Sequence, residues 1–184
     1  MTGFAETIAA GGVVVFPADT VYGLACDPEN ADAVARLYAL KGRPPDKPAA
    51  VMVFALADLP ELGPRTQALA QRLLPGAVTL LVPSARYPLA GGAGTLGLRV
   101  PDLPRFAGVP PVLQTSANIA GGPDARRLAD VPPQIRAGAD LVIDGGELPG
   151  TPSTVIDLRG YEAGGDLRIV RQGAVPEAVI RSLA

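Results

Sequence analysis

The sequence predicts an α/β fold in which a twisted, mixed β-sheet is flanked by helices. Short apolar runs bounded by Gly or Pro recur along the chain, as strands do, and segments with helical periodicity lie between some of them. From residue 78 onward several predicted strands follow one another without room for a helix, which indicates antiparallel as well as parallel pairs. With 184 residues, 48% hydrophobic and 18% charged, we expect one domain over residues 1–184.

The predicted elements are short and follow from local patterns. Asn30 can cap a helix in which Val34, Leu37, Tyr38 and Lys41 share one stripe. Further helices are predicted at residues 64–74 and 176–183, and the predicted strands are residues 13–16, 50–55, 78–82, 96–100, 112–115, 141–143, 154–158 and 167–170. Gly91, Gly92, Gly94 and Gly97 lack the spacing and context of a dinucleotide-binding fingerprint, and we interpret them as a flexible turn.

The composition excludes several classes of chemistry. Histidine is absent, which removes Ser-His-Asp triads, histidine general bases and histidine-ligated metals. The single cysteine, Cys26, cannot form an internal disulfide, and we interpret it as a small buried apolar residue. The net charge of -2 gives no general attraction to nucleic acid. No apolar run is long enough for a membrane helix and no secretion signal is visible, so we expect a cytoplasmic protein without membrane contact.

A local cationic patch lies at residues 41–48, directly after the helix that Asn30 begins. The chain has two lysines and fourteen arginines, and both lysines, Lys41 and Lys47, lie in this patch with Arg43. Two ammonium groups and a forked guanidinium on a loop stiffened by proline could clamp a polyphosphate. Alternatively, the cations offset the helix dipole, for which one cation would suffice. We favour the phosphate interpretation.

Hydroxyl and amide side chains gather at the ends of three predicted strands. Thr20 follows the first strand, Ser116 and Asn118 follow the run at 112–115, and Ser153 precedes the run at 154–158. Ligands tend to bind at strand ends in α/β sheets, although a turn stabilised by its own side chains explains Thr20 equally well. Because no histidine can activate a serine here, we interpret Ser116 and Ser153 as binding groups.

Two arginines accompany apolar runs. Arg99 lies within the run at 96–100, and Arg171 follows the run at 167–170. A buried guanidinium needs an anionic partner, either a structural carboxylate or a ligand. For each arginine alone, the sequence favours structural pairing.

Seven blocks of the sequence stand out together: PADTVYGL from Pro17, KGRP from Lys41, PGAVTLLV from Pro75, LRVP from Leu98, TSANIAGGP from Thr115, STVID from Ser153 and IVRQG from Ile169. In this order they resemble the YrdC/Sua5 family of L-threonylcarbamoyladenylate synthases. No block is very specific alone, but seven in the family's order over roughly residues 8–174 make a chance resemblance improbable.

The resemblance implies a concave, locally positive groove and a reaction that joins L-threonine, bicarbonate and ATP. Threonylcarbamoyl-AMP and pyrophosphate would be released, for the N6-threonylcarbamoyladenosine modification of tRNA. ATP is then a substrate, with Mg²⁺ on its phosphates, and Lys41 and Arg43 take the catalytic role. The resemblance also implies threonine binding by Thr20, Arg99, Ser116 and Ser153, and ATP binding by Lys41, Arg43, Lys47, Asn118 and Arg171, with Thr95 and Arg126 as weaker candidates.

The resemblance is to the short, single-domain form, which passes its labile product to a separate tRNA-modifying complex; a weak tRNA contact of its own stays open. The chain departs from the family at three positions. Met52 stands where some relatives have histidine, Asp19 replaces a more usual glutamate, and Lys47 stands where asparagine is common. The departure at Met52 puts one expected threonine contact in doubt.

Two other functions compete with this one. An RNA-binding module without catalysis fits the basic patch, but aromatic residues make up only 4% of the chain, too few for base-stacking platforms. A carbamoyl-adenylate-forming domain, as in hydrogenase maturation proteins, also fits the resemblance. Such domains usually belong to long multidomain chains.

Overall fold

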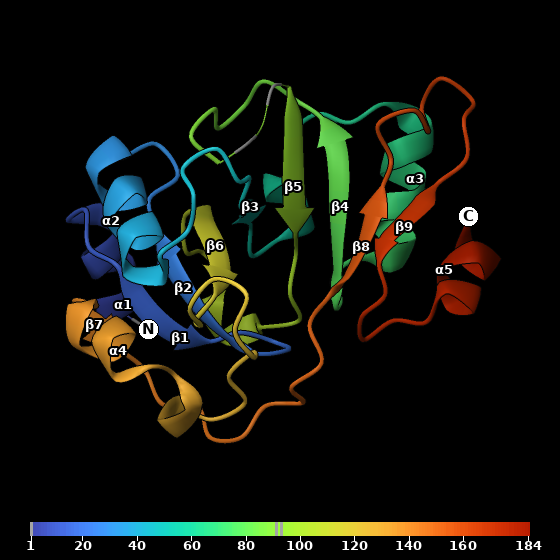
Figure 1. The fold of residues 1–184 in the computed structure, drawn as a ribbon. Helices are drawn as coiled ribbons and strands as arrows, with labels where there is room; N and C mark the ends of the chain where they lie inside the picture. Colours follow the sequence, from blue (N-terminus) through green and yellow to red (C-terminus); the bar gives the residue numbers. More distant parts are fainter. Residues whose placement is uncertain (1, 91, 93) are drawn as a thin grey trace.

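A computed structural model describes residues 2–90, 92 and 94–184 and confirms the mixed α/β sheet. Within the described residues nine strands form one sheet in the order β7-β1-β2-β6-β3-β5-β4-β8-β9 (Figure 1). The strands are β1 Val14–Pro17, β2 Tyr22–Cys26, β3 Ala50–Met52, β4 Val78–Pro83, β5 Thr95–Arg99, β6 Val112–Ser116, β7 Leu141–Val142, β8 Thr154–Asp157 and β9 Arg168–Arg171. The pairs β1·β7, β3·β5 and β4·β8 are parallel and the other five are antiparallel, as the crowded strands after residue 78 predicted.

Helices cover the sheet and its ends. They are α1 Thr2–Ala9, α2 Ala31–Lys41, α3 Pro64–Leu73, α4 Pro133–Gly138 and α5 Glu177–Leu183, with short 3₁₀ turns at Leu56–Asp58, Pro104–Phe106 and Leu128–Asp130. Among the residues that the structure describes, no helix is long and apolar enough to cross a membrane.

Helix α2 has the boundaries that its sequence predicts. The Asn30 side chain accepts a hydrogen bond from the Ala33 amide at 3.0 Å, which caps the first turn. Gly42 ends the helix in the left-handed conformation, with φ 58°, where glycine pays no Cβ penalty. The buried stripe includes Leu37, Tyr38 and Lys41, so the last buried residue of the helix is a charged one.

The sequence analysis did not predict strand β2, helix α1 or helix α4, and each of them lacks the sequence pattern that is typical of its type. Strand β2 is fully buried but contains Gly23 and small residues, so its period and β-propensity are weak. Helix α1 has no acidic residue in its first turn and no basic residue in its last. Helix α4 has six residues and begins after Pro132 and at Pro133, which read as loop residues in the sequence. Gly91 of the predicted turn lies outside the described residues, and Gly97 lies in β5, so its assignment to a turn was wrong.

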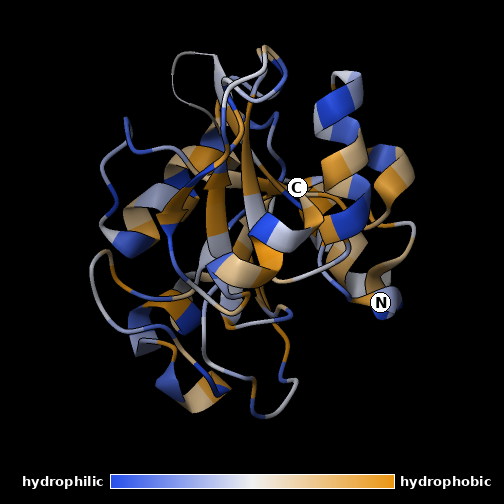
Figure 2. Cartoon of the chain, turned by 90° about the vertical axis from the view of Figure 1, so that its right-hand side faces the viewer, coloured by the Kyte–Doolittle hydropathy of each residue, from blue (hydrophilic) through white to orange (hydrophobic). Residues whose placement is uncertain are grey.

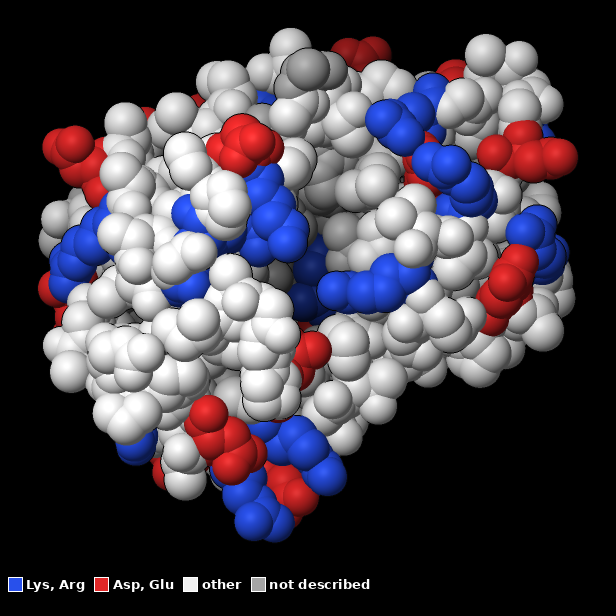
Figure 3. Space-filling view, viewed as in Figure 1, with Lys and Arg blue, Asp and Glu red and all other residues white. Residues whose placement is uncertain are grey.

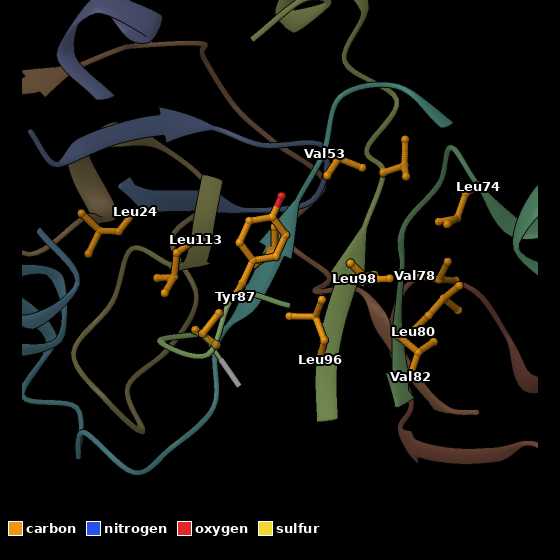
Figure 4. Close-up of a cluster of buried hydrophobic side chains, with 14 of the residues drawn as sticks. Leu24, Val53, Leu74, Val78, Leu80, Val82, Tyr87, Leu96, Leu98 and Leu113 are labelled. Carbon is orange, nitrogen blue, oxygen red and sulfur yellow. The ribbon is translucent and has the colours of Figure 1, made fainter. Parts of the chain in front are cut away.

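Two hydrophobic clusters lie on opposite faces of the sheet, because successive residues of a strand point to opposite sides. Along β1, Val15 joins the larger cluster, whereas Val14 and Phe16 join the smaller one with Phe4 of α1 and Phe106. Figure 2 shows apolar residues concentrated on the strands, whereas the helices carry both apolar and polar residues. Figure 4 shows Leu80, Leu96 and Leu98 of β4 and β5, among others, on the larger-cluster side. Cys26 is buried in the same cluster, as predicted.

Candidate active site

A cavity of about 490 Å³ lies over the central strands, on the face opposite the larger core cluster. This arrangement arises because successive side chains along each strand point to opposite faces of the sheet. On β4, Leu80 enters the core, whereas Thr79 and Leu81 line the cavity. On β5, Leu96 and Leu98 enter the core, whereas Gly97 and Arg99 line the cavity. Figure 3 shows the cavity as a hollow in the middle of this face.

Small residues from neighbouring strands form the cavity floor. Gly97 of β5 lies in register with Ala50 of β3 on one side and with Leu81 of β4 on the other. A Cβ atom added at Gly97 would lie 3.4 Å from the Ala50 Cα and Cβ atoms. A larger side chain at Gly97 would therefore occupy the space that a ligand needs.

Cationic side chains surround the cavity, as the blue atoms beside the hollow in Figure 3 indicate. Arg43, Arg99, Arg159 and Arg171 line it, and among the described lining residues Asp124 contributes one carboxylate. The cavity is therefore suited to an anionic ligand, although the chain carries a net charge of -2. Within residues 2–90, 92 and 94–184, no three Asp, Glu or Cys side chains form a group that could hold a metal ion.

Arg99 and Asp19 form a buried ion pair at the cavity wall. The Arg99 Nη2 atom lies 2.6 Å from Asp19 Oδ1, and the two side chains are only 5% and 9% exposed. The structural carboxylate that the sequence favoured is thus present. The buried Arg99 Nε, Asp19 Oδ2 and Thr20 Oγ1 atoms have no hydrogen-bond partner in the described part of the chain. Because unpaired buried polar atoms are costly, these three atoms indicate a ligand.

The serines of two predicted strand ends lie on the cavity wall and are held by neighbours. Ser153 Oγ lies 2.8 Å from Thr79 Oγ1, and Arg171 donates to the Ser153 carbonyl at 2.8 Å. The Ser116 hydroxyl donates to Asn118 Oδ1 at 2.6 Å. Neither serine has a base beside it in these contacts, which agrees with a binding role.

Arg43 lies on the loop after α2 and lines the cavity. Its side chain also hydrogen-bonds to the backbone of this loop. Arg43 donates through Nε to the Lys47 carbonyl at 3.3 Å and through Nη2 to the Pro48 carbonyl. Its guanidinium also lies 5.6 Å from the centre of the Tyr38 ring. The Lys47 side chain is exposed and does not line the cavity.

Lys41 is buried beneath the cavity wall, with 1% of its surface exposed. Its ammonium donates to the Asn118 carbonyl at 2.8 Å, to Asn118 Oδ1 at 2.9 Å and to the Ser116 carbonyl. The pKa of Lys41 is lowered from 10.5 to about 8, chiefly by burial and then by the charge of Arg43; Asp124 opposes this change, and Lys47 has a smaller lowering effect.

The lowered pKa of Lys41 gives a pH prediction for stability. The Lys41 ammonium loses a proton near pH 8 in the folded protein and near pH 10.5 in the unfolded chain. Between these two values the unfolded chain binds more protons, so the contribution of Lys41 to the free energy of unfolding increases as the pH rises. This gain is lost when the pH falls back through 8. In urea unfolding at pH 7.5 and 9.5, the free-energy difference between the wild type and Lys41→Met should change in favour of the wild type at the higher pH, by at most about 1.4 kcal/mol per pH unit. A difference that is constant or moves the other way would contradict this.

The structure brings seven of the predicted site residues to one cavity. They are Thr20, Arg43, Thr95, Arg99, Ser116, Ser153 and Arg171. Lys41, Lys47, Asn118 and Arg126 are not among its lining residues. Arg126 is exposed and pairs with Glu147 at 3.0 Å, which directs its guanidinium to the surface.

Five further polar side chains line the cavity that the sequence analysis did not assign to the site, namely Thr79, Gln114, Thr115, Asp124 and Arg159. Thr79 and Gln114 are polar residues inside otherwise apolar runs, and that pattern was the available signal. Met52 is buried in the smaller hydrophobic cluster and does not line the cavity.

Comparison with known proteins agrees with the blocks found in the sequence. The sequence model of the Sua5/YciO/YrdC family, described as "Telomere recombination", matches residues 6–173. The chain belongs to this family. The structure of Pyrococcus abyssi Sua5 complexed with L-threonine is 30% identical in sequence and superposes with a TM-score of 0.87, over 98% of this chain and 56% of that one.

Two relatives named threonylcarbamoyl-AMP synthase differ in length. The relative from Bacillus subtilis is 35% identical to this chain, in an alignment that covers 78% of this chain and 46% of the relative. The one from Stutzerimonas stutzeri is 38% identical over 86% of the chain, which covers 92% of the relative. The chain thus spans about half of the longer relative and nearly all of the shorter one.

Proposed function

We propose that the chain is an L-threonylcarbamoyladenylate synthase. It would convert L-threonine, bicarbonate and ATP into threonylcarbamoyl-AMP and pyrophosphate. The observation that carries the proposal is an arginine-lined cavity with Thr20 and Arg99 in its wall, beside which Thr20 Oγ1, Arg99 Nε and Asp19 Oδ2 are buried without a hydrogen-bond partner among the described residues. These atoms could bind an amino acid, and the arginines could bind a nucleotide.

The threonine site would lie beside the Arg99–Asp19 pair. The free Arg99 Nε is a donor for a carboxylate, Asp19 Oδ2 is an acceptor for an ammonium or hydroxyl, and Thr20 Oγ1 can be either. Ser116 and Ser153 add hydroxyls on the same cavity wall. Support also comes from the P. abyssi relative, whose structure was determined with L-threonine.

The nucleotide would lie against the remaining arginines, as Mg·ATP. Arg43 and Arg171 enter the cavity from opposite sides of the sheet centre, on the loop after α2 and on β9. Arg159 is an additional candidate, held by hydrogen bonds of 2.9 and 2.7 Å to Asp157. Guanidinium groups bind phosphate oxygens through paired hydrogen bonds, so the cavity could hold both the leaving pyrophosphate and the α-phosphate.

The chemistry needs positioning and charge neutralisation rather than a covalent enzyme intermediate. Bicarbonate loses hydroxide to give carbon dioxide, and the neutral threonine amine adds to it, losing a proton to form the carbamate. A carbamate oxygen then attacks the α-phosphorus, and the bond to the bridging oxygen of pyrophosphate breaks. Arginines can stabilise the charge that develops on the phosphoryl oxygens, which suits a chain without histidine.

The product would be passed to a separate tRNA-modifying complex, because a mixed anhydride of a carbamate hydrolyses readily in water. The decisive test is pyrophosphate release from Mg·ATP and bicarbonate with and without L-threonine, with serine and carbamoyl phosphate as comparison substrates. Threonine-dependent release with a new adenylate product supports the proposal. Release with carbamoyl phosphate alone indicates a carbamoyl-adenylate former, and absence of release in every mixture favours a binding module.

Arg43→Ala should raise the KM for ATP on the order of tenfold, because it removes a charge-assisted phosphate contact. Because Arg43 lies on a loop and is partly exposed, the overall fold should persist, although the loop loses the hydrogen bonds to the Lys47 and Pro48 carbonyls. Steady-state kinetics with varied ATP measure the effect, and Arg72→Ala on α3, whose guanidinium contacts the Leu183 carbonyl, is the matched control. Equal KM values for the two variants would remove Arg43 from the nucleotide site.

A further inference from the structure

The ammonium of Lys41 is fully engaged by the chain's own oxygens. An ammonium has three N–H donors, and here three acceptors receive them: the carbonyls of Ser116 and Asn118 and the Asn118 side chain. The partners lie 75 and 77 residues further along the sequence, at the end of β6. The contact therefore ties the end of α2 to the turn that follows β6.

We infer that Lys41 is a positioning residue, whose ammonium fixes the turn at residues 116–118 so that the Ser116 side chain faces the cavity. The inference rests on the proposed function, because it assigns Ser116 to the threonine site. It replaces the phosphate contact that the sequence suggested for Lys41 with an indirect role.

Burial and geometry favour positioning over phosphate contact. Lys41 is 1% exposed and does not line the cavity, whereas Ser116 does. To reach a phosphate, the Lys41 ammonium would have to break its three hydrogen bonds, and the acceptors inside the protein would lose this donor. Arg43, two residues later, already lines the cavity and can supply the cation that a phosphate needs.

Asn118 extends the same network and is also fully engaged. Its Oδ1 accepts from both Lys41 and the Ser116 hydroxyl, and its Nδ2 donates to the Gly122 carbonyl at 2.6 Å. The Lys41 carbonyl in turn accepts from the Ala120 amide at 2.9 Å. Asn118 thus orients the Ser116 hydroxyl, and Lys41 holds Asn118 in place. Loss of the ammonium would therefore release the Asn118 carbonyl, the Asn118 side chain and the Ser116 hydroxyl together.

The residue type fits this role. Three acceptors arranged around one point suit a compact ammonium, whereas a guanidinium is a planar fork with spread donors. The chain uses arginine at fourteen of its sixteen basic positions, so lysine at this buried site stands out against its general usage. A neutral side chain would leave the Ser116 and Asn118 carbonyls without this donor and Asn118 Oδ1 with the Ser116 hydroxyl alone.

Chemical labelling of the wild-type protein tests the placement of Lys41 without any assay of activity. Brief treatment with acetic anhydride at pH 7.5, followed by peptide mass spectrometry, reports separately on the chain's two lysines. Exposed Lys47 serves as the internal control. We expect Lys41 to be labelled at least about 100-fold more slowly than Lys47, with or without Mg·ATP, because labelling requires local opening. Labelling of Lys41 as fast as Lys47 would overturn the inference, whether or not Mg·ATP then protects it.

A double-mutant cycle tests the action through Ser116. Lys41→Met and Ser116→Ala should each raise the KM for L-threonine on the order of tenfold, the double variant should be no worse than the poorer single variant, and the KM for ATP should stay within about threefold. A purely structural role would lower the active fraction, and hence kcat, without moving the threonine KM. Additive effects, or a larger change in the ATP KM, would overturn the inference.

The two experiments separate failure of this inference from failure of the proposed function. If the wild type shows no threonine-dependent pyrophosphate release, the proposed function fails, whereas labelling still reports whether Lys41 is held by the turn. If Lys41→Met does not fold, the labelling result alone decides, since it needs no variant.

Discussion

Replacing Arg99 by methionine is expected to abolish threonine-dependent pyrophosphate release and to lower the free energy of unfolding by about 3–5 kcal/mol. The substitution removes a donor from the proposed threonine site and also strands the Asp19 carboxylate, whose side chain is 9% exposed. A buried charge that loses its partner is among the costliest single changes in a protein. Urea unfolding and the pyrophosphate assay measure the two effects separately.

Asp19→Asn in the Arg99→Met background is the informative control. The amide carries no charge, so the double variant should regain part of the lost stability while remaining inactive, because the guanidinium is still missing. If Arg99→Met unfolds within about 1 kcal/mol of the wild type, the ion pair does not have the structural importance assigned to it here. If the double variant regains activity, Arg99 does not bind substrate.

Gly97→Val is expected to lower kcat/KM on the order of a hundredfold, because its methyl groups would occupy the cavity floor. Gly97 lies between Ala50 and Leu81 on the ligand side of the sheet, and its Cβ position is already 3.4 Å from Ala50. Valine is favourable in strands, so the fold should persist. Steady-state kinetics and circular dichroism check the two statements.

A graded series makes this prediction sharper. Gly97→Ala should fall between the wild type and Gly97→Val, because it adds one methyl group to the floor. Gly160→Ala is the control, since a Cβ at Gly160 meets no atom within 4 Å. Equal activity of Gly97→Val and the wild type would show that no substrate lies over the floor.

The sequence was most informative where local chemistry decides the structure. The cap at Asn30 and the glycine at position 42 define α2, and runs rich in Val and Leu define the strands that the core needs. It was least informative where a partner distant in the chain decides. Strand β2 is stabilised by pairing with β1 and β6 rather than by its own β-propensity. The glycine within it weakens the strand pattern in the sequence.

The site shows the same division. Motif order led to Thr20, Arg99, Ser116 and Ser153, which the fold gathers around one cavity. The surroundings of Lys41 could not be deduced, because a lysine at the end of a helix looks the same in sequence whether it faces a ligand or a turn 75 residues away. Likewise, only the fold shows that Arg126 meets Glu147 at the surface.

The strand order also bears on how the chain is synthesised. Strand β6 lies between β2 and β3 in the sheet, yet in the sequence it follows both of them and also β4 and β5. Until residues 112–116 leave the ribosome, β1–β2 and β3–β5–β4 can form only as separate pieces with open edges. A nascent chain stalled before this point should therefore be prone to aggregation and unable to bind substrate, because Ser116 arrives with the strand that joins the pieces.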